Sequence, residues 1–139
     1  MTKFEVGVTG TRNGMTDHQK NLVFSTLSRI KEYWSEPVLH HGDCVGVDVE
    51  VAQIAMDLGY TIVCHPPEKD HLRGFHKSHY FKEPFHYFKR NRNIVDASDL
   101  VLVIPRESSH QSSGGTWYTH DYAVKKNKPI YTFWPNQDD

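Results

Sequence analysis

The segment Leu100-Val101-Leu102-Val103-Ile104 and the loop Ser112-Ser113-Gly114-Gly115-Thr116 that follows it decide the fold. An unbroken apolar run of this length, with polar segments on both sides, is typical of a strand buried in a parallel sheet. The Gly-Gly pair allows the backbone to turn sharply and to come close to a ligand. A helix that begins here presents unpaired N–H groups and the positive end of its dipole to an anion. This part of the chain therefore predicts a strand, an anion-binding turn and a helix in succession.

Two other strand ends carry similar loops. Val6-Gly7-Val8 runs into Thr9-Gly10-Thr11-Arg12, and Val38-Leu39-His40 runs into His41-Gly42-Asp43-Cys44-Val45-Gly46. One such loop would be weak evidence, because tight turns between a strand and a helix commonly use glycine, but three in one short chain predict a ligand of the nucleotide type. The candidate ligand-binding residues in these loops are Gly10, Thr11, Arg12, Gly42, Asp43, Gly46, Ser113, Gly114, Gly115 and Thr116.

Several of these positions also have a purely structural interpretation. Arg12 is placed to clamp a phosphate with two hydrogen bonds, or it is a solvated arginine in a surface turn. Asp43 is placed to accept hydrogen bonds from a ribose hydroxyl, whereas Asp48 is placed to cap the following helix. The Ser113 and Thr116 hydroxyls can bind phosphate, cap the helix, or do both.

Predicted strands alternate with predicted helices along the whole chain. Apolar patterns predict strands over residues 3–9, 38–41, 61–64, 100–104 and 129–133. Helices are expected after the capping pair Thr16 and Gln19, over 47–58 before Gly59, from about 85 to 97, and over 116–126. This order predicts one domain over residues 1–139, with an α/β, Rossmann-like, doubly wound and mostly parallel five-stranded sheet and helices on both faces. Ligands of such folds bind beyond the carboxyl ends of the strands, where all three loops are expected to lie.

The composition argues against several classes of partner. The formal net charge is -1 and the isoelectric point is about 6.8, so we expect no broad electrostatic binding to nucleic acid. No apolar run approaches the ~20 residues of a membrane helix, and no apolar leader marks a signal peptide. The cysteines, Cys44 and Cys64, are consistent with reduced thiols in the cytoplasm. We therefore expect a cytoplasmic protein whose partner is a small molecule and not a membrane.

Residues 66–84 interrupt the regular pattern with histidines, aromatic side chains and lysines. A metal site at His76 and His79 is one interpretation, but this spacing matches no common zinc pattern. Stacking of single-stranded nucleic acid on the aromatic residues is a second. We favour a third, a lid over the ligand or a packing insertion with solvated histidines, because long irregular loops are often functional. We expect no metal site and no cofactor.

The loops together resemble those of the SLOG superfamily. The resemblance rests on Gly10-Thr11-Arg12, the segment His41 to Asp48, Arg90-Asn91-Arg92-Asn93 and Ser113-Gly114-Gly115-Thr116, and it covers about residues 4–134. The superfamily includes the DNA-processing protein DprA, the Lonely Guy phosphoribohydrolases and small YspA-like proteins proposed to sense nucleotides, all with a Rossmann-like fold. The phosphoribohydrolase pattern places an arginine nine residues before Asp99, which selects Arg90 as a further ligand-binding candidate. Arg90 and Arg92 lie about 200° apart on a helix, so only one of them can face the site.

One departure from the resemblance concerns catalysis. In the phosphoribohydrolases a catalytic Glu follows the Gly-Thr pair at the third position, and here that residue is Thr119. Threonine has no charge to stabilise an oxocarbenium-like sugar. Asp121 is expected to face away from that position, about 200° further around the helix. His120 and Asp121, as helix neighbours, are expected to diverge. The resemblance thus implies a binding site that lacks its usual catalytic group.

Three functions follow as alternatives. The chain binds a nucleotide or an ADP-ribose-type ligand as a sensor or sequestering module, which we favour. It is an N-glycosidase acting on nucleoside monophosphates, with Asp43, Glu50 or Asp121 in place of the missing acid. It binds single-stranded DNA as DprA does. Trp117 and Tyr118 either stack on a base or belong to the core or a subunit contact, and family analogy favours a homodimer.

Overall fold

The computed structural model describes residues 2–136, in which six strands form one parallel sheet. The sheet has the order β4-β3-β2-β1-β5-β6, and every neighbouring pair is parallel. The strands are β1 (Lys3–Gly10), β2 (Glu36–His41), β3 (Thr61–Cys64), β4 (Tyr80–Phe81), β5 (Leu100–Ile104) and β6 (Ile130–Thr132). The order reverses between β1 and β5, so the crevice that such folds use for ligands is expected beyond these two strands.

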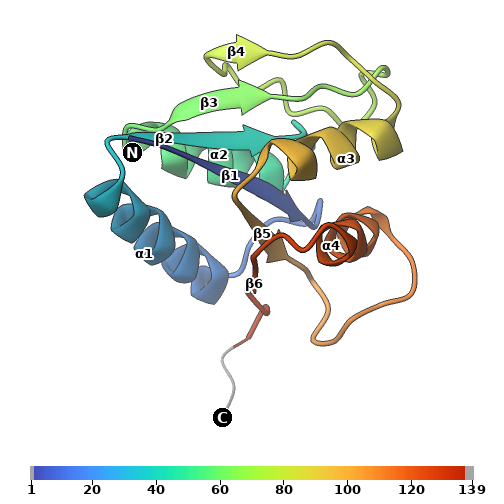
Figure 1. Cartoon of the computed structure of the whole chain (residues 1–139). Helices are drawn as coiled ribbons and strands as arrows, with labels where there is room; N and C mark the ends of the chain where they lie inside the picture. Colours follow the sequence, from blue (N-terminus) through green and yellow to red (C-terminus); the bar gives the residue numbers. More distant parts are fainter. Residues whose placement is uncertain (1, 137–139) are drawn as a thin grey trace.

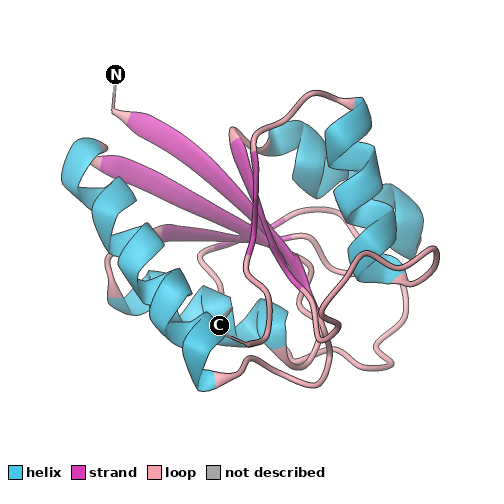
Figure 2. Cartoon of the chain, turned by 90° about the horizontal axis from the view of Figure 1, so that it is seen from below, coloured by secondary structure: helices cyan, strands magenta, loops and turns pink. Residues whose placement is uncertain are grey.

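Four helices cover the two faces of the sheet (Figures 1 and 2). They are α1 (Asp17–Tyr33), α2 (Val47–Asp57), α3 (Tyr87–Ala97) and α4 (Gly115–Lys125). Helices α1 and α2 pack on one face over a core that includes Val6, Val23 and Val51. Helices α3 and α4 pack on the other face, where Val101 and Trp117 belong to a smaller core. The doubly wound α/β fold expected from the sequence is confirmed.

The number of strands was underestimated, because the sheet has six strands and not five. The additional strand, β4, lies inside the segment 66–84 that was expected to be irregular. It pairs with Val63 and Cys64, and backbone bonds from His79 to Ile62 and from Lys82 to Cys64 extend the pairing. A strand of two residues is too short for any hydrophobic alternation, so the sequence contains no signal for it.

The capping residues predicted at the start of α1 form the hydrogen bonds expected of them. Thr16 and Gln19 form a reciprocal capping box at the start of α1. The Gln19 amide also donates to the carbonyls of Pro105 and Phe133, which ties this helix to the ends of β5 and β6. Within the described range no helix is both long and apolar enough to cross a membrane. The expected homodimer stays a prediction.

Three histidines are buried and held in neutral form: His40 and His41 at the end of β2, and His65 directly after β3. His40 bonds Glu5 through Nε2 and His65 through Nδ1, at 2.9 and 2.8 Å. His41 accepts the Asp43 backbone N–H at Nδ1 and bonds the Ser78 hydroxyl at Nε2. Burial lowers the pKa of His41 and of His65 to about 3 in each case, and it also lowers that of His40 against the opposing effect of Glu5. Protonation of these rings therefore opposes folding.

We predict that the protein loses stability as the pH falls below 6.5. Between pH 6.5 and 3 the unfolded chain binds protons on His41 and His65 that the folded chain does not, so acid favours unfolding. Asp48 acts in the opposite direction between pH 6 and 3.8, because burial raises its folded pKa to about 6 and the folded state binds its proton first. The net effect near pH 5 is roughly one proton, or roughly 1–2 kcal/mol per pH unit.

Urea unfolding at pH 7, 6 and 5 measures this slope. His65→Gln should flatten it, and equal stability at pH 7 and 5 would contradict the assignment.

Candidate functional site

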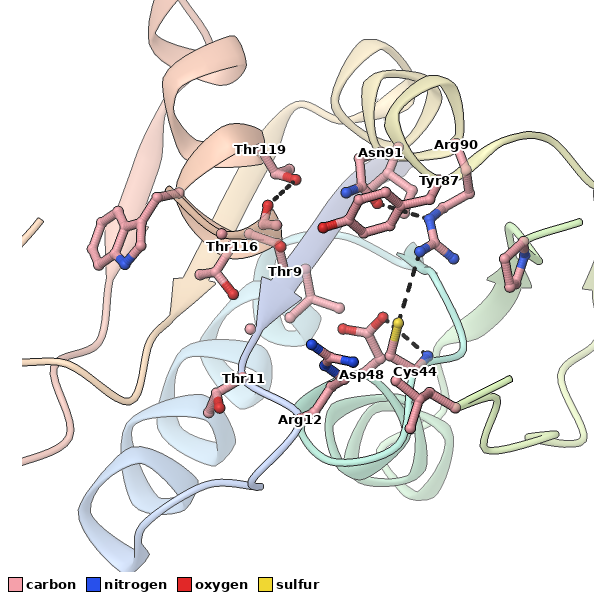
Figure 3. Close-up of a pocket in the computed structure, with 18 of the residues that line it drawn as sticks. Thr9, Thr11, Arg12, Cys44, Asp48, Tyr87, Arg90, Asn91, Thr116 and Thr119 are labelled. Atoms are coloured by element: carbon pink, nitrogen blue, oxygen red, sulfur yellow. Dashed lines mark hydrogen bonds between the residues drawn. The ribbon is translucent and has the colours of Figure 1, made fainter. Parts of the chain in front are cut away.

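A cavity of about 560 Å³ lies beyond the carboxyl ends of β1 and β5, between the amino ends of α3 and α4 (Figure 3). Its volume falls within the ~300–1,000 Å³ typical of small-molecule sites. Its walls come from all three predicted loops, from α3 and from the segment after β3. The lining residues are Val8, Thr9, Gly10, Thr11, Arg12, Asn13, Cys44, Asp48, Pro67, Glu68, Lys69, His71, Leu72, His86, Tyr87, Arg90, Asn91, Ile94, Arg106, Glu107, Ser113, Gly114, Gly115, Thr116, Trp117 and Thr119.

The amino end of α4 forms one wall of the cavity. Ser113, Gly114, Gly115 and Thr116 all line it. Their contact with a ligand stays a prediction. Gly114 precedes the helix with φ of +104°, and a Cβ atom built on it would meet nothing within 4 Å. Among residues 2–136, no side chain caps this end of the helix. The first backbone N–H groups of α4 and the positive end of its dipole are therefore available to an anion.

The β1 loop brings a cationic side chain to the same cavity. Arg12 points into the space between β1 and α2, and its guanidinium makes no hydrogen bond or ion pair with any residue from 2 to 136 (Figure 3). Gly46 positions the loop, because a Cβ atom there would lie 2.5 Å from the Arg12 carbonyl group, and its φ is +90°. The Thr11 hydroxyl is already engaged with Asn13. Arg12 is thus the free cation of the first loop.

The second loop contributes less to the cavity than expected. Cys44 lines it, but Gly42, Asp43 and Gly46 do not, which corrects their expected placement. Asp43 is fully buried with φ of +60°, and its carboxylate accepts from Arg73 Nε at 2.9 Å and from the His76 backbone N–H at 2.8 Å. These partners belong to the segment after β3, some 30 residues further along the chain. Asp43 therefore anchors that segment and does not line the cavity.

Arg90 lines the cavity and also holds the second loop together. Its Nη1 donates to the carbonyls of Gly42 and His65, and its Nε donates to Asn91 Oδ1 at 2.7 Å. Its Nη2 has only a long contact of 3.7 Å with Cys44 Sγ among the described residues (Figure 3). Arginine has five N–H donors, so Arg90 can fix the loop and still offer Nη2 to an anion. The packing also accounts for Gly42, because a Cβ atom there would lie 2.8 Å from Arg90 Nη1.

Asp48 forms the floor of the cavity beside Arg90. Its Oδ2 accepts from the backbone N–H groups of Gly42 and Cys44, so it holds the loop before α2. The expectation that Asp48 caps the helix was wrong, because Asp48 lies within α2 and, among the described residues, no side chain caps the helix start at Gly46. Burial raises the pKa of Asp48 to about 6, although Arg90 counteracts this effect. Burial likewise raises the pKa of the neighbouring Cys44 thiol to about 11, so this thiol is not a nucleophile at neutral pH.

The segment 66–84 forms the outer wall of the cavity at Pro67, Lys69 and Leu72. Its two candidate metal ligands do not meet. His76 bonds Ser78 Oγ and Gln53, whereas His79 Nδ1 accepts the Ile62 backbone N–H. The structure thus gives no support to a metal site at this pair.

Thr119 occupies the position of the family's catalytic Glu and lies in the cavity wall. It is buried, and its hydroxyl donates to the Gly115 carbonyl at 2.8 Å. Asp121 does not line the cavity, as expected, and the Glu50 carboxylate accepts the Met15 backbone N–H outside it. Trp117 is buried against Trp134 and belongs to the core. The carboxylates considered as replacements for the missing acid therefore lie outside the cavity.

Sequence reasoning missed the contribution of Tyr87. Its hydroxyl lies against Gly115, 2.5 Å from where a Cβ atom would stand, and its ring lies near the Arg90 guanidinium. Asn91, one residue after Arg90, also lines the cavity (Figure 3). The basic and aromatic residues near Tyr87 drew attention to this segment of the sequence, but nothing in it singled out Tyr87. Only the packing of α3 against α4 brings this ring to the glycine turn.

The fold is shared with solved structures of known proteins. No protein-family model matches the chain, and no curated protein matches it in sequence. The molybdenum cofactor binding protein of Rippkaea orientalis superposes with a TM-score of 0.70 and 23% identity over 100% of this chain and 79% of that protein. The molybdenum cofactor carrier protein of Chlamydomonas reinhardtii gives 0.63 and 19% over 94% and 76%. DNA processing protein A of Helicobacter pylori gives 0.65 and 21% over 94% and 65%. The chain therefore has the fold of these proteins, the Rossmann-like fold that its resemblance to the SLOG superfamily predicts.

Proposed function

We propose that the chain binds a phosphate-bearing ligand of the nucleotide type in this cavity, as a sensor or sequestering module. The observation that carries the proposal is the unpaired Arg12 guanidinium, which lines the same cavity as the uncapped amino end of α4. A phosphate bound there would be neutralised by Arg12 and would accept backbone N–H bonds at Gly115 and Thr116. The open space at Gly114 allows the close approach that such bonds need.

The rest of the cavity suits an organic group attached to the phosphate. Leu72 and Ile94 provide apolar surface, and the Tyr87 ring offers a face for stacking. Asn91 and Asp48 provide a small number of polar groups for orientation. Apolar walls with few convergent polar groups are typical of cofactor and nucleotide sites.

The same residues favour binding over catalysis. An N-glycosidase needs a carboxylate beside the sugar, and the position that carries it in the related enzymes holds Thr119. Of the carboxylates in the cavity wall, Asp48 holds the backbone of the second loop, Glu107 accepts from the Trp117 indole, and Glu68 is exposed at the rim. Each of the first two is committed to a structural bond, which supports a site without hydrolytic chemistry.

We expect a phosphate-bearing ligand to raise the melting temperature of the protein. The panel should contain AMP, ADP-ribose, adenosine, inorganic phosphate and a single-stranded oligonucleotide. It should also contain the molybdenum cofactor, because two proteins with this fold bind or carry it. Mass spectrometry of molecules released from freshly purified, heat-denatured protein extends the search. A ligand at one hundred times its Kd stabilises the folded state by about 2.7 kcal/mol.

The proposal has a matched control. Arg12→Met should abolish the shift, whereas Arg29→Met, which removes an exposed cation on α1, should leave it unchanged. Adenosine should bind at least tenfold more weakly than AMP if phosphate is the anchor. A panel with no shift and no released molecule, or an equal shift in Arg12→Met, would overturn the proposal. Salt-sensitive binding of the oligonucleotide alone would favour the DNA-binding alternative instead.

A further inference from the structure

Two histidines and an aspartate converge outside the cavity, on the face of α4 that is turned toward the β5–α4 loop. His110 comes from the loop, and His120 and Asp121 come from the helix. His110 Nε2 and His120 Nδ1 both lie 2.8 Å from the same atom, Asp121 Oδ1. The expectation that His120 and Asp121 diverge was wrong, because both side chains bend toward this third partner from the loop.

The donor set is one that transition metals prefer. It offers two imidazole nitrogens and one carboxylate oxygen, and all three atoms lie within 4.8 Å of one another. Ligands of a tetrahedral Zn²⁺ ion, with bonds of about 2.0–2.1 Å, are separated by about 3.3 Å. The two nitrogen–oxygen separations of 2.8 Å and the limit of 4.8 Å on the third bracket this value, so the cluster has the dimensions of a coordination site. Its side chains are partly exposed, at 48%, 21% and 55% for His110, His120 and Asp121, so water can complete the coordination.

Aromatic packing holds the two imidazoles in place. The Trp117 ring lies 4.8 Å from the His110 ring and 5.3 Å from the His120 ring. Trp117 is itself fixed by stacking on Trp134 and by the hydrogen bond of its indole to Glu107. Rings fixed in this way lose little freedom when they bind an ion, which favours affinity.

A second group also has residue types that bind metals: His41, Asp43 and Cys64. It differs from the first group in how its atoms are already bonded. There both nitrogens of His41 and both oxygens of Asp43 are already bonded to protein groups, and burial raises the pKa of Cys64 to about 12. An ion would have to break each of these bonds. In the cluster on α4 an ion would replace only the two hydrogen bonds to Asp121.

We propose that His110, His120 and Asp121 bind one divalent ion of the Zn²⁺ class, with water in the remaining position. Such an ion would join the β5–α4 loop to the helix, next to the Ser113-Gly114 turn. This site is independent of the proposed ligand of the cavity.

The test uses the untagged full chain and Co²⁺ as a spectroscopic probe, with Zn²⁺ titrated by calorimetry. We expect one equivalent of Zn²⁺ to bind and to displace Co²⁺, together with visible Co²⁺ absorption of tetrahedral intensity. His110→Ala and Asp121→Asn should each weaken binding at least tenfold, whereas His18→Ala on α1 should leave it unchanged. These substitutions are at the surface, and circular dichroism checks that the variants fold. Absence of saturable one-equivalent binding, or equal binding in His110→Ala, would overturn the proposal.

Discussion

Arg90→Met should reduce the free energy of unfolding by at least about 3 kcal/mol, a large part of the ~5–15 kcal/mol typical of a domain. Methionine retains much of the side-chain volume but donates no hydrogen bond. The carbonyls of Gly42 and His65 would then lose their shared donor, Arg90 Nη1. A buried polar group without a partner costs about 1–3 kcal/mol. Urea unfolding at pH 7 measures the loss.

Asp48 adds to this effect. The Arg90 charge counteracts the burial that raises the pKa of Asp48, so removing it leaves the buried carboxylate without this compensation. Asp48→Asn should therefore recover part of the stability lost in Arg90→Met, because an amide carries no charge to desolvate.

Arg92→Met is the matched control on the same helix. Arg92 donates to the Tyr118 hydroxyl at 2.7 Å and is only half-buried, so its loss should cost about 1 kcal/mol or less. Equal stability of the two variants would show that Arg90 does not hold the second loop. The family resemblance selects Arg90 for ligand binding, and the structure adds this second role without removing the first.

Local patterns were sufficient for most of the elements. The strands over 61–64 and 100–104 were predicted residue for residue, because each is an apolar run with clear polar or proline boundaries. The capping pair at Thr16 and the glycine at 59 mark helix ends through bonds within a few residues. Such signals can be recognised in a single sequence because the residues that interact lie within a few positions of one another.

What could not be predicted depends on partners distant in the chain. Asp43 lies in a glycine-containing loop, where an aspartate can accept hydrogen bonds from a ribose, but its carboxylate accepts from Arg73 instead. Strand β4 is formed by its pairing with Val63 and Cys64 of β3, and its own two residues carry no strand pattern. The meeting of His110 with Asp121 requires the loop before α4 to fold back on the helix. In each case the deciding contact is tertiary, so no periodicity or spacing in the sequence predicts it.

Gly115→Val should weaken binding of the phosphate-bearing ligand about 100-fold while the fold is kept. Gly115 does not have a positive φ, so valine is compatible with its backbone. The new Cβ atom would stand 2.5 Å from the Tyr87 hydroxyl, and the nearest atoms to it all belong to this side chain. Tyr87 is 38% exposed and can turn outward, which relieves the clash without unfolding the core. The valine methyl groups would then occupy the space from which a phosphate approaches the backbone N–H groups of α4.

Two or more charge-assisted hydrogen bonds to the phosphate would be lost, and about 2.7 kcal/mol corresponds to the 100-fold change. Calorimetry with AMP or ADP-ribose, whichever stabilises the wild type more, measures the affinity. Ser108→Val is the matched control, because Ser108 is an exposed residue of the same loop that does not line the cavity. Its affinity should equal that of the wild type. Unchanged affinity in Gly115→Val, with a melting temperature near that of the wild type, would show that the anion does not bind at the amino end of α4.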